Sequence, residues 1–191
     1  MRIVQILFLA LILVGCDTQP TVNGVDILGY GTYSMETTAI KDAPELAAGK
    51  RREAVPTWLV SGTNNISGSL GVCFGFHYCL QGNPPGGEIP LTTRIIFPTP
   101  GMKNPATGQV FAQNEYTLLR NIGQKYTVGY GFDHEWEIIE GKWTIQLWLR
   151  DRKLAEKEFV VSKEKNQKSV EQSGGAYFLP EAVKKSAHPW R

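Results

Sequence analysis

Two cysteines and a histidine lie close together in the sequence, at Cys73, His77 and Cys79. Thiolate and imidazole groups bind zinc and form redox sites. From Leu70 to Leu80 large apolar residues alternate with small or polar ones, which predicts one extended strand. On that strand His77 and Cys79 share a face, but Cys73 lies too far along it to join them. A metal or redox site at His77 and Cys79 is therefore only a subsidiary hypothesis, with two ligands at most.

The same strand bears on whether the thiols pair. Cys73 and Cys79 would lie about 20 Å apart along it, whereas a disulfide requires Cα atoms about 5.5 Å apart. Exported proteins can keep disulfides, and a turn at Gly75 would allow this one. We favour two free thiols on a continuous strand, and a Cys73–Cys79 disulfide stays open as an alternative.

Acidic side chains are concentrated between Asp133 and Glu140, in the sequence DHEWEIIE. Two carboxylates can catalyse hydrolysis as general acid and base if they converge on one substrate. On a strand, His134 would point away from the carboxylates on both sides of it. We therefore predict no catalytic residues, and a hydrolase that uses these carboxylates is kept as an alternative.

Trp148 is a candidate for binding at a surface. Apolar side chains alternate from Trp143 to Leu149, which predicts that this set shares one face of a strand and that Trp148 lies on the other. Together with Thr144 and Gln146, Trp148 could form a surface for a protein partner or a glycan. Cover by a sheet edge or a second sheet is the structural alternative.

The first sixteen residues have the pattern of a lipoprotein signal. Arg2 precedes an apolar run from Ile3 to Leu13, which closes on Leu13-Val14-Gly15-Cys16. The run is about half of the ~20 residues that a membrane-spanning helix needs. We therefore expect residues 1–15 to be removed as a signal peptide and Cys16 to be the site of lipid attachment.

Lipidation at Cys16 predicts where the protein works. Bacterial lipoproteins carry three acyl chains, and because one chain alone binds a bilayer with K of about 10⁴ M⁻¹, three make attachment effectively permanent. We predict a lipid anchor, including palmitate, in the cell membrane, facing the periplasm. Asp17 resembles the inner-membrane retention signal of enteric lipoproteins, which favours the inner membrane without excluding the outer one.

The composition excludes one class of partner. The 191 residues include 20 Lys plus Arg and 18 Asp plus Glu. This balance is too close to neutral to hold nucleic acid by counterion release, so we expect no nucleic-acid partner. We also expect no cofactor. The 20 Gly and 11 Pro favour strands joined by tight turns.

About eight short strands separated by turn residues predict an all-β fold, which we interpret as an immunoglobulin-like antiparallel β-sandwich. The expected strands are residues 25–33, 57–60, 70–80, 89–97, 126–132, 136–138, 143–149 and 154–161. The charged segment from Glu36 to Pro56 is expected to be a loop. The long connection from Pro98 to Lys125 either binds something or contains a short strand near Glu115 to Leu119.

These elements give four segments. Residues 1–15 are the removed signal, residues 16–24 a linker, residues 25–161 the single sandwich domain and residues 162–191 a polar C-terminal tail. Pro180 could begin a short helix at residues 180–187 in that tail.

Several phrases together resemble a family of short bacterial domains catalogued as a domain of unknown function. The phrases are Gly29-Tyr30-Gly31-Thr32-Tyr33, Phe74-Gly75-Phe76, Asn83-Pro84-Pro85-Gly86, Asn104-Pro105-Ala106-Thr107-Gly108, Glu135-Trp136-Glu137, Gly141-Lys142-Trp143-Thr144 and Lys153-Leu154-Ala155-Glu156-Lys157. The resemblance covers roughly Val25 to Val161. It supports the fold and carries over no activity or catalytic residue, and the two cysteines are not part of the pattern.

Together these observations predict a lipid-anchored envelope protein whose β-sandwich binds an unidentified envelope protein or glycan without catalysis. The alternatives are an envelope hydrolase acting through the carboxylates near Asp133 to Glu140 and a metal or redox site at His77 and Cys79.

Overall fold

The computed structural model describes residues 19–163, except for the side chains of residues 54–59. The expected signal peptide, Cys16, Asp17 and the helix at residues 180–187 lie outside the described residues. Within residues 19–163, no helix is both long and apolar enough to cross a membrane.

The described residues form eleven strands, and the all-β sandwich is confirmed. The four-stranded sheet contains β2 (Lys50–Ser61), β1 (Thr21–Asp42), β4 (Cys73–Asn83) and β9 (Lys125–Gly131), in that spatial order. The five-stranded sheet contains β3 (Asn65–Ser67), β11 (Arg152–Ser162), β10 (Gly141–Leu149), β5 (Glu88–Ile96) and β8 (Gln113–Asn121). A small hairpin joins β6 (Met102–Lys103) to β7 (Val110–Phe111).

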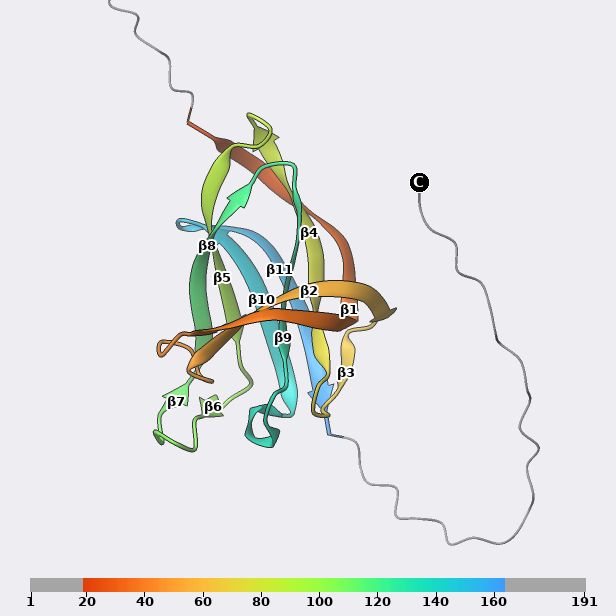
Figure 1. Ribbon diagram of the computed structural model, residues 1–191, viewed down its shortest axis with the longest axis vertical. Helices are drawn as coiled ribbons and strands as arrows, with labels where there is room; N and C mark the ends of the chain where they lie inside the picture. Colours follow the sequence, from red (N-terminus) through yellow and green to blue (C-terminus); the bar gives the residue numbers. More distant parts are fainter. Residues whose placement is uncertain (1–18, 164–191) are drawn as a thin grey trace, which may run out of the picture.

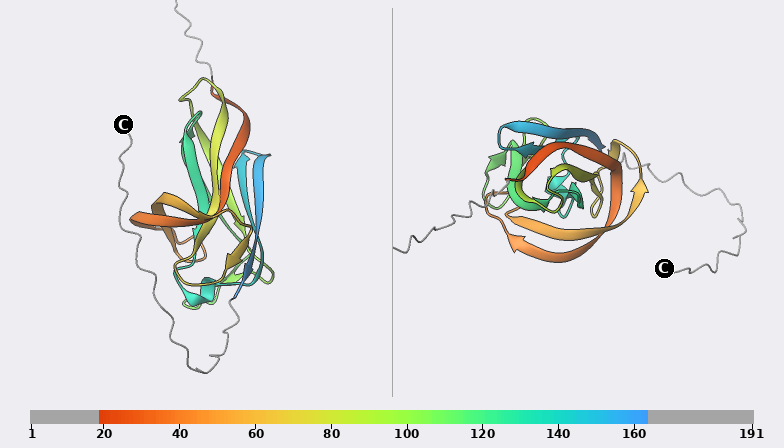
Figure 2. Two further views of the ribbon diagram at one scale, coloured as in Figure 1. Left: turned by 90° about the vertical axis from the view of Figure 1, so that its right-hand side faces the viewer. Right: turned by 90° about the horizontal axis from the view of Figure 1, so that it is seen from above.

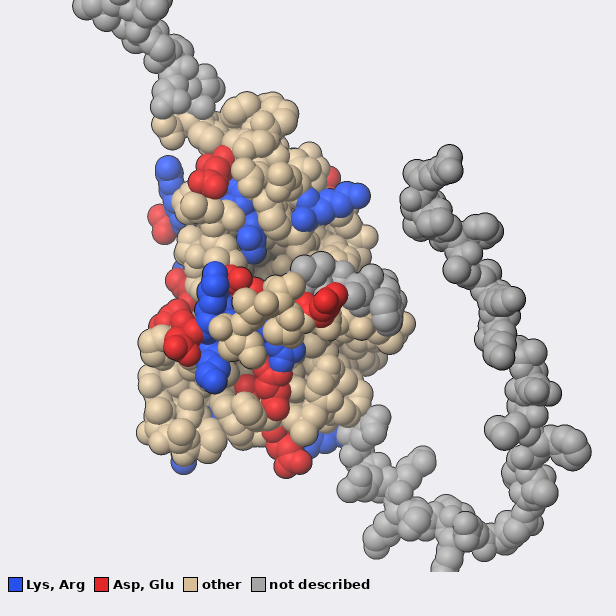
Figure 3. All heavy atoms as spheres, in the orientation of Figure 1, with Lys and Arg blue, Asp and Glu red and all other residues tan. Residues whose placement is uncertain are grey.

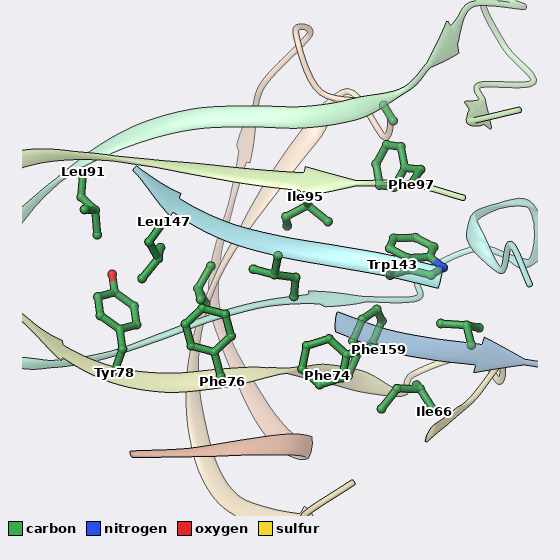
Figure 4. Close-up of a cluster of buried hydrophobic side chains, with 14 of the residues drawn as sticks. Ile66, Phe74, Phe76, Tyr78, Leu91, Ile95, Phe97, Trp143, Leu147 and Phe159 are labelled. Atoms are coloured by element: carbon green, nitrogen blue, oxygen red, sulfur yellow. The ribbon is translucent and has the colours of Figure 1, made fainter. Parts of the chain in front are cut away.

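The core lies where the two sheets face each other. The alternate apolar residues of β4 point inward, and each is at most 1% exposed; they are Phe74, Phe76, Tyr78 and Leu80. Trp143 from β10 lies opposite and is fully buried (Figure 4). Its ring centroid is 5.0 Å from Phe97 and Tyr130, 5.6 Å from Phe74 and 5.7 Å from Phe132. The predicted alternation of β4 and β10 is therefore confirmed.

β1 belongs to two pairings along its length. Its first half pairs with β4, from Thr21 opposite Asn83 to Tyr33 opposite Cys73. Its second half pairs with β2, out to Asp42 opposite Lys50. At the transition Gly31 has a positive φ of 137°, a conformation that favours glycine. The second half of β1 and β2, residues 34–60, form a hairpin that crosses the rest of the four-stranded sheet, and we call it the arm (Figures 1 and 2).

The arm corrects the expected loop from Glu36 to Pro56, and it also absorbs the expected short strand at residues 57–60. Its tip is fixed by two asparagines from elsewhere in the chain. Ala47 donates its backbone N–H to Oδ1 of Asn114 (2.8 Å), and Asn104 donates its side-chain amide to the Ala47 carbonyl (2.9 Å). Backbone pairing and these distant contacts, rather than a local apolar pattern, make the segment extended.

Two further expectations change. The connection from Pro98 to Lys125 contains β6, β7 and the full-length strand β8, which includes the short strand expected at residues 115–119. The strand expected at residues 136–138 is wrong, because Glu135–Glu137 forms a 3₁₀ turn, η1. The Glu137 carboxylate accepts the backbone N–H of Asp133 (2.6 Å) and of His134 (3.2 Å), which stabilises a turn and not a strand there.

Candidate functional site

A groove of about 390 Å³ lies beside the arm, between β9 and the inner face of β8. Figure 3 shows a hollow in the surface above the arm, with basic side chains at its rim. Apolar and aromatic residues form much of its wall, among them Met35, Leu46, Tyr116 and Leu118. The groove is concave, partly open and of the size of a small-ligand or short-peptide site.

The two strands beside the groove contribute to it in different ways. β8 contributes every second residue, namely Asn114, Tyr116, Leu118 and Arg120, so one face of this strand lines the groove. β9 contributes five consecutive residues, from Thr127 to Gly131. Consecutive residues line a groove when the edge of the strand, and not one face, is turned toward it. β9 is the last strand of its sheet, so this edge has no neighbouring strand among the described residues.

The arm contributes charged residues from the start of β2. Arg51 Nη2 lies 3.3 Å from Oε1 of Glu53, and Lys41 Nζ lies 2.8 Å from the same oxygen. The hydrogen bond and charge of Lys41, together with the charge of Arg51, hold the pKa of Glu53 below its ordinary value. Arg52 forms an ion pair with Asp133, beyond the end of β9.

Two cations at the groove have no such partner. Neither Lys50 nor Arg120 forms an ion pair with a carboxylate of the described residues. The Arg120 guanidinium instead lies 4.5 Å from the ring centroid of Tyr126, a cation–π contact. Burial raises the pKa of the nearby Tyr78 to about 12, against the opposing effect of the Arg120 charge. The groove therefore has cationic charge available for a ligand.

The end of the groove next to η1 contains Asp133 and Glu137, two of the acidic residues that the sequence singled out. Glu137 is 1% exposed, and burial raises its pKa although two backbone N–H groups and the Arg52 charge favour the ionised form. Burial and the adjacent Glu137 also raise the pKa of Tyr130. Asp133 and Glu137 thus line the groove. Asp133 already pairs with Arg52, and Glu137 already accepts a backbone N–H.

The remaining members of that acidic segment lie elsewhere. Glu135 and Glu140 are exposed and do not line the groove, and Glu140 accepts the backbone N–H of Lys163 (2.9 Å). The His134 ring stacks on Trp136 with centroids 5.8 Å apart. The structure therefore does not bring the acidic side chains of residues 133–140 together into one set.

Cys73, His77 and Cys79 lie on the outer face of β4. Both cysteines are free, with Cys73 buried and Cys79 half-buried. Cys73 Sγ is 3.8 Å from Nη1 of Arg52, and burial raises the pKa of this thiol. His77 Nδ1 lies 2.6 Å from Oγ1 of Thr127, and burial lowers the pKa of the imidazole. No group of three or more His, Cys, Asp or Glu side chains in residues 19–163 could hold a metal ion.

Trp148 lies on the outer face of the five-stranded sheet and does not line the groove. It is half-buried, and the Arg94 guanidinium covers its ring at 4.4 Å from the centroid. Its Nε1–H donates to Oε1 of Gln146 (2.8 Å), whose amide donates to Oε2 of Glu156 (2.7 Å). Trp148 is thus one part of a polar network and not an open aromatic surface.

Sequence reasoning did not find the groove. Its residues come from separate parts of the chain, in β1, the turn after it, β2, β4, β5, β8, β9 and η1. The sequence carries two local signals, the acidic segment that supplies Asp133 and Glu137 and the basic triplet Lys50-Arg51-Arg52. The position of the triplet beside β9 depends on the arm, which only the fold creates.

Comparison with known proteins supports the fold. A family model described as Domain of unknown function (DUF3859) matches residues 21–161. An immunoglobulin-like protein from Pseudomonas aeruginosa, with a crystal structure at 1.50 Å resolution, aligns with a TM-score of 0.54 and 25% identity. The alignment covers 78% of this chain and 100% of that one. No curated protein matches this chain.

Proposed function

Because this chain belongs to the family described as Domain of unknown function (DUF3859) and has an immunoglobulin-like fold, we propose that it is a binding or adaptor domain of the bacterial envelope. In this proposal, lipid on Cys16 tethers the protein to the membrane and the groove beside the arm binds another envelope component. The proposed function is binding, without catalysis.

The groove is the observation that carries this proposal. It combines a volume of about 390 Å³, within the range of ligand sites, with a wall that is partly apolar and aromatic and partly charged. Lys50 and Arg120 lack carboxylate partners among the described residues, whereas Asp133 and Glu137 are already engaged. Cations that are available and acids that are occupied suit recognition of a negatively charged partner better than acid–base chemistry.

The position of the sandwich relative to the proposed anchor is compatible with this function. β1 starts at Thr21, five residues after Cys16, and a segment of that length spans at most about 18 Å. In Figure 1, the chain enters at one end of the sandwich and the arm crosses it farther down. A tether at Cys16 would thus leave the groove on the side of the domain and open to the periplasm.

The anchor is tested by comparing the full chain with Cys16→Ala in a bacterial host. Wild-type protein is expected to incorporate radioactive palmitate and to lose its signal, whereas the variant takes up no label and keeps the signal. Globomycin, which blocks signal removal from lipoproteins, should slow the electrophoretic migration of the wild type only. Equal palmitate labelling of the two proteins, or no effect of globomycin on the wild type, would contradict the anchor.

The groove is tested separately with a photo-crosslinking amino acid. Placed at Leu118, inside the groove, it is expected to give crosslinked products in intact cells. The control position is Val160 on β11, which is 47% exposed and lies outside the groove. Equal crosslinking from both positions, or none from Leu118, would count against the groove as the binding site.

A further inference from the structure

We propose, resting on the groove as the binding site, that its ligand is an extended acidic segment of a partner protein, added as a strand along the outer edge of β9. This deepens the proposed function by naming the class of ligand and the way it binds. Three observations support this mode of binding: the open edge of β9, the register of that strand and the cations that line the groove.

The register shows which backbone groups of β9 are available. Phe132 donates its N–H to the Val72 carbonyl, toward β4 (3.1 Å). The β4–β9 pairing runs without a register shift from Cys73 opposite Gly131 to Cys79 opposite Lys125. Hydrogen-bonded pairs recur at every second residue of an antiparallel ladder. The N–H and C=O groups of residues 125, 127, 129 and 131 therefore point away from β4, and those of the last three face the groove.

The space beside this edge is the groove itself, with a volume of about 390 Å³. An added strand lies about 4.8 Å from its neighbour in the hydrogen-bonding direction, so it would occupy the groove along Thr127, Gly129 and Gly131. Every second side chain of the added strand would then meet the inner face of β8, where Arg120 lies in line with Tyr116 and Leu118.

The alternative edge, on β8, is less suited to this role. β8 also ends its sheet, but it turns one face and not its edge toward the groove. At its end the Asn121 N–H already donates to the Tyr126 hydroxyl (2.9 Å). The edge of β9, in contrast, has no neighbouring strand among the described residues, and the groove beside it is partly open. Binding by strand addition is an established mode of peptide recognition in other proteins.

The cations that line the groove favour acidic side chains on the added strand. Lys50 and Arg120 line the groove without carboxylate partners among the described residues, and Arg51 shares Glu53 with Lys41. Acidic side chains on the face of the ligand that meets β8 and the arm would pair with these cations. β9 has seven residues, so a segment of about seven residues would cover it.

The first experiment selects peptides from a phage-displayed random decapeptide library with the detergent-solubilised full chain. We expect enrichment of sequences with at least two acidic residues at alternating positions and β-branched or aromatic residues between them. No enrichment, or enrichment of basic or proline-rich sequences, would overturn the proposal. Binding of a sulfated oligosaccharide in place of any peptide would overturn it in favour of a glycan ligand.

The second experiment measures the affinity of a selected peptide by fluorescence anisotropy. N-methylation of the two peptide amides that pair with β9 is expected to weaken binding at least about tenfold, because each methyl group removes one backbone hydrogen bond. Arg120→Gln should weaken binding about three- to fivefold, in the range of a partly exposed ion pair. The matched control, Lys142→Gln on the outer face of β10, should leave the affinity unchanged.

Amide hydrogen exchange tests the position of the added strand. Peptide binding should slow exchange at Thr127, Gly129 and Gly131, and leave exchange at Glu115 and Thr117 on the outer edge of β8 unchanged. Slowing on β8 alone would overturn the mode of binding. If crosslinking from Leu118 succeeds and no acidic peptide binds, the strand-addition inference fails while the proposed function stands; if crosslinking also fails, both fail.

Discussion

Arg52 on the arm forms an ion pair with Asp133, which follows β9, and this contact ties the arm to the body of the sandwich. The Arg52 side chain also reaches Cys73 on β4, with Nη1 3.8 Å from Sγ. Arg52 thus connects the arm, β4 and the segment that follows β9. It lines the end of the groove next to η1. The arm is otherwise held at its tip by Asn104 and Asn114.

Asp133→Asn should loosen the arm without unfolding the domain. The two side chains are 27% and 46% exposed, so solvent screens the pair and its loss should lower the free energy of unfolding by no more than about 1 kcal/mol. Faster amide exchange is expected in the arm, at residues 36–53, and not in β10. Glu158→Gln, which removes the exposed pair with Lys142, is the control and should not alter exchange in the arm.

Trp143→Ala should be among the most destabilising single substitutions. The side chain is fully buried among aromatic rings, and its Nε1–H donates to the Ile139 carbonyl (2.9 Å). Removal of a buried tryptophan leaves a large cavity and typically costs about 3–5 kcal/mol. Urea unfolding would measure this loss, with the half-buried Trp148→Ala as the control. A smaller loss for Trp143→Ala than for Trp148→Ala would contradict the assigned core.

Gly31→Ala should disturb the bend of β1. A Cβ at this position would lie 1.9 Å from the Ser61 carbonyl oxygen, and the φ of 137° is unfavourable for alanine. We expect a loss of about 1–3 kcal/mol, the range for such backbone strain. Gly29→Ala is the matched control, because its Cβ would meet only the Tyr33 hydroxyl at 3.9 Å. Equal thermal stability of the two variants would show that β1 does not bend at Gly31.

Glu137→Gln should change how stability depends on pH. Burial raises the pKa of Glu137 in the folded state, so the folded protein keeps this proton at pH values where the unfolded chain has lost it. The contribution of Glu137 to stability is therefore largest below the ordinary carboxyl pKa of about 4.3 and falls as pH rises through the raised value. The free energy of unfolding of the variant relative to wild type should increase between about pH 4 and pH 7. A difference that is constant across this range would contradict the raised pKa.

Thiol titration checks the state of the cysteines in the Cys16→Ala chain. Two free thiols are expected under denaturing conditions without reductant. In the folded protein Cys79 should react before Cys73, because Cys73 is buried and its pKa is raised by that burial. Finding no free thiol in the denatured protein would instead show that Cys73 and Cys79 had formed a disulfide.

The strands of the core could be predicted because their information is local. In β4 and β10 one face is buried and the side chains alternate, so residues such as Phe76 and Leu147 mark the inner face in the sequence itself. The interruption after Phe132 was harder to predict. Trp136 and Ile138 continue the alternation, but the Glu137 carboxylate binds two backbone N–H groups and forms a turn.

By itself the sequence determined the all-β class, the inward faces of the main strands and the expectation of a lipid anchor. Only the tertiary structure decided that the charged segment after Glu36 is a paired arm and that Lys50 and Arg120 face the same groove. The physical reason is that the arm has little alternating apolar pattern of its own. It is held extended by pairing between β1 and β2 and by hydrogen bonds to Asn104 and Asn114, partners far away in the sequence.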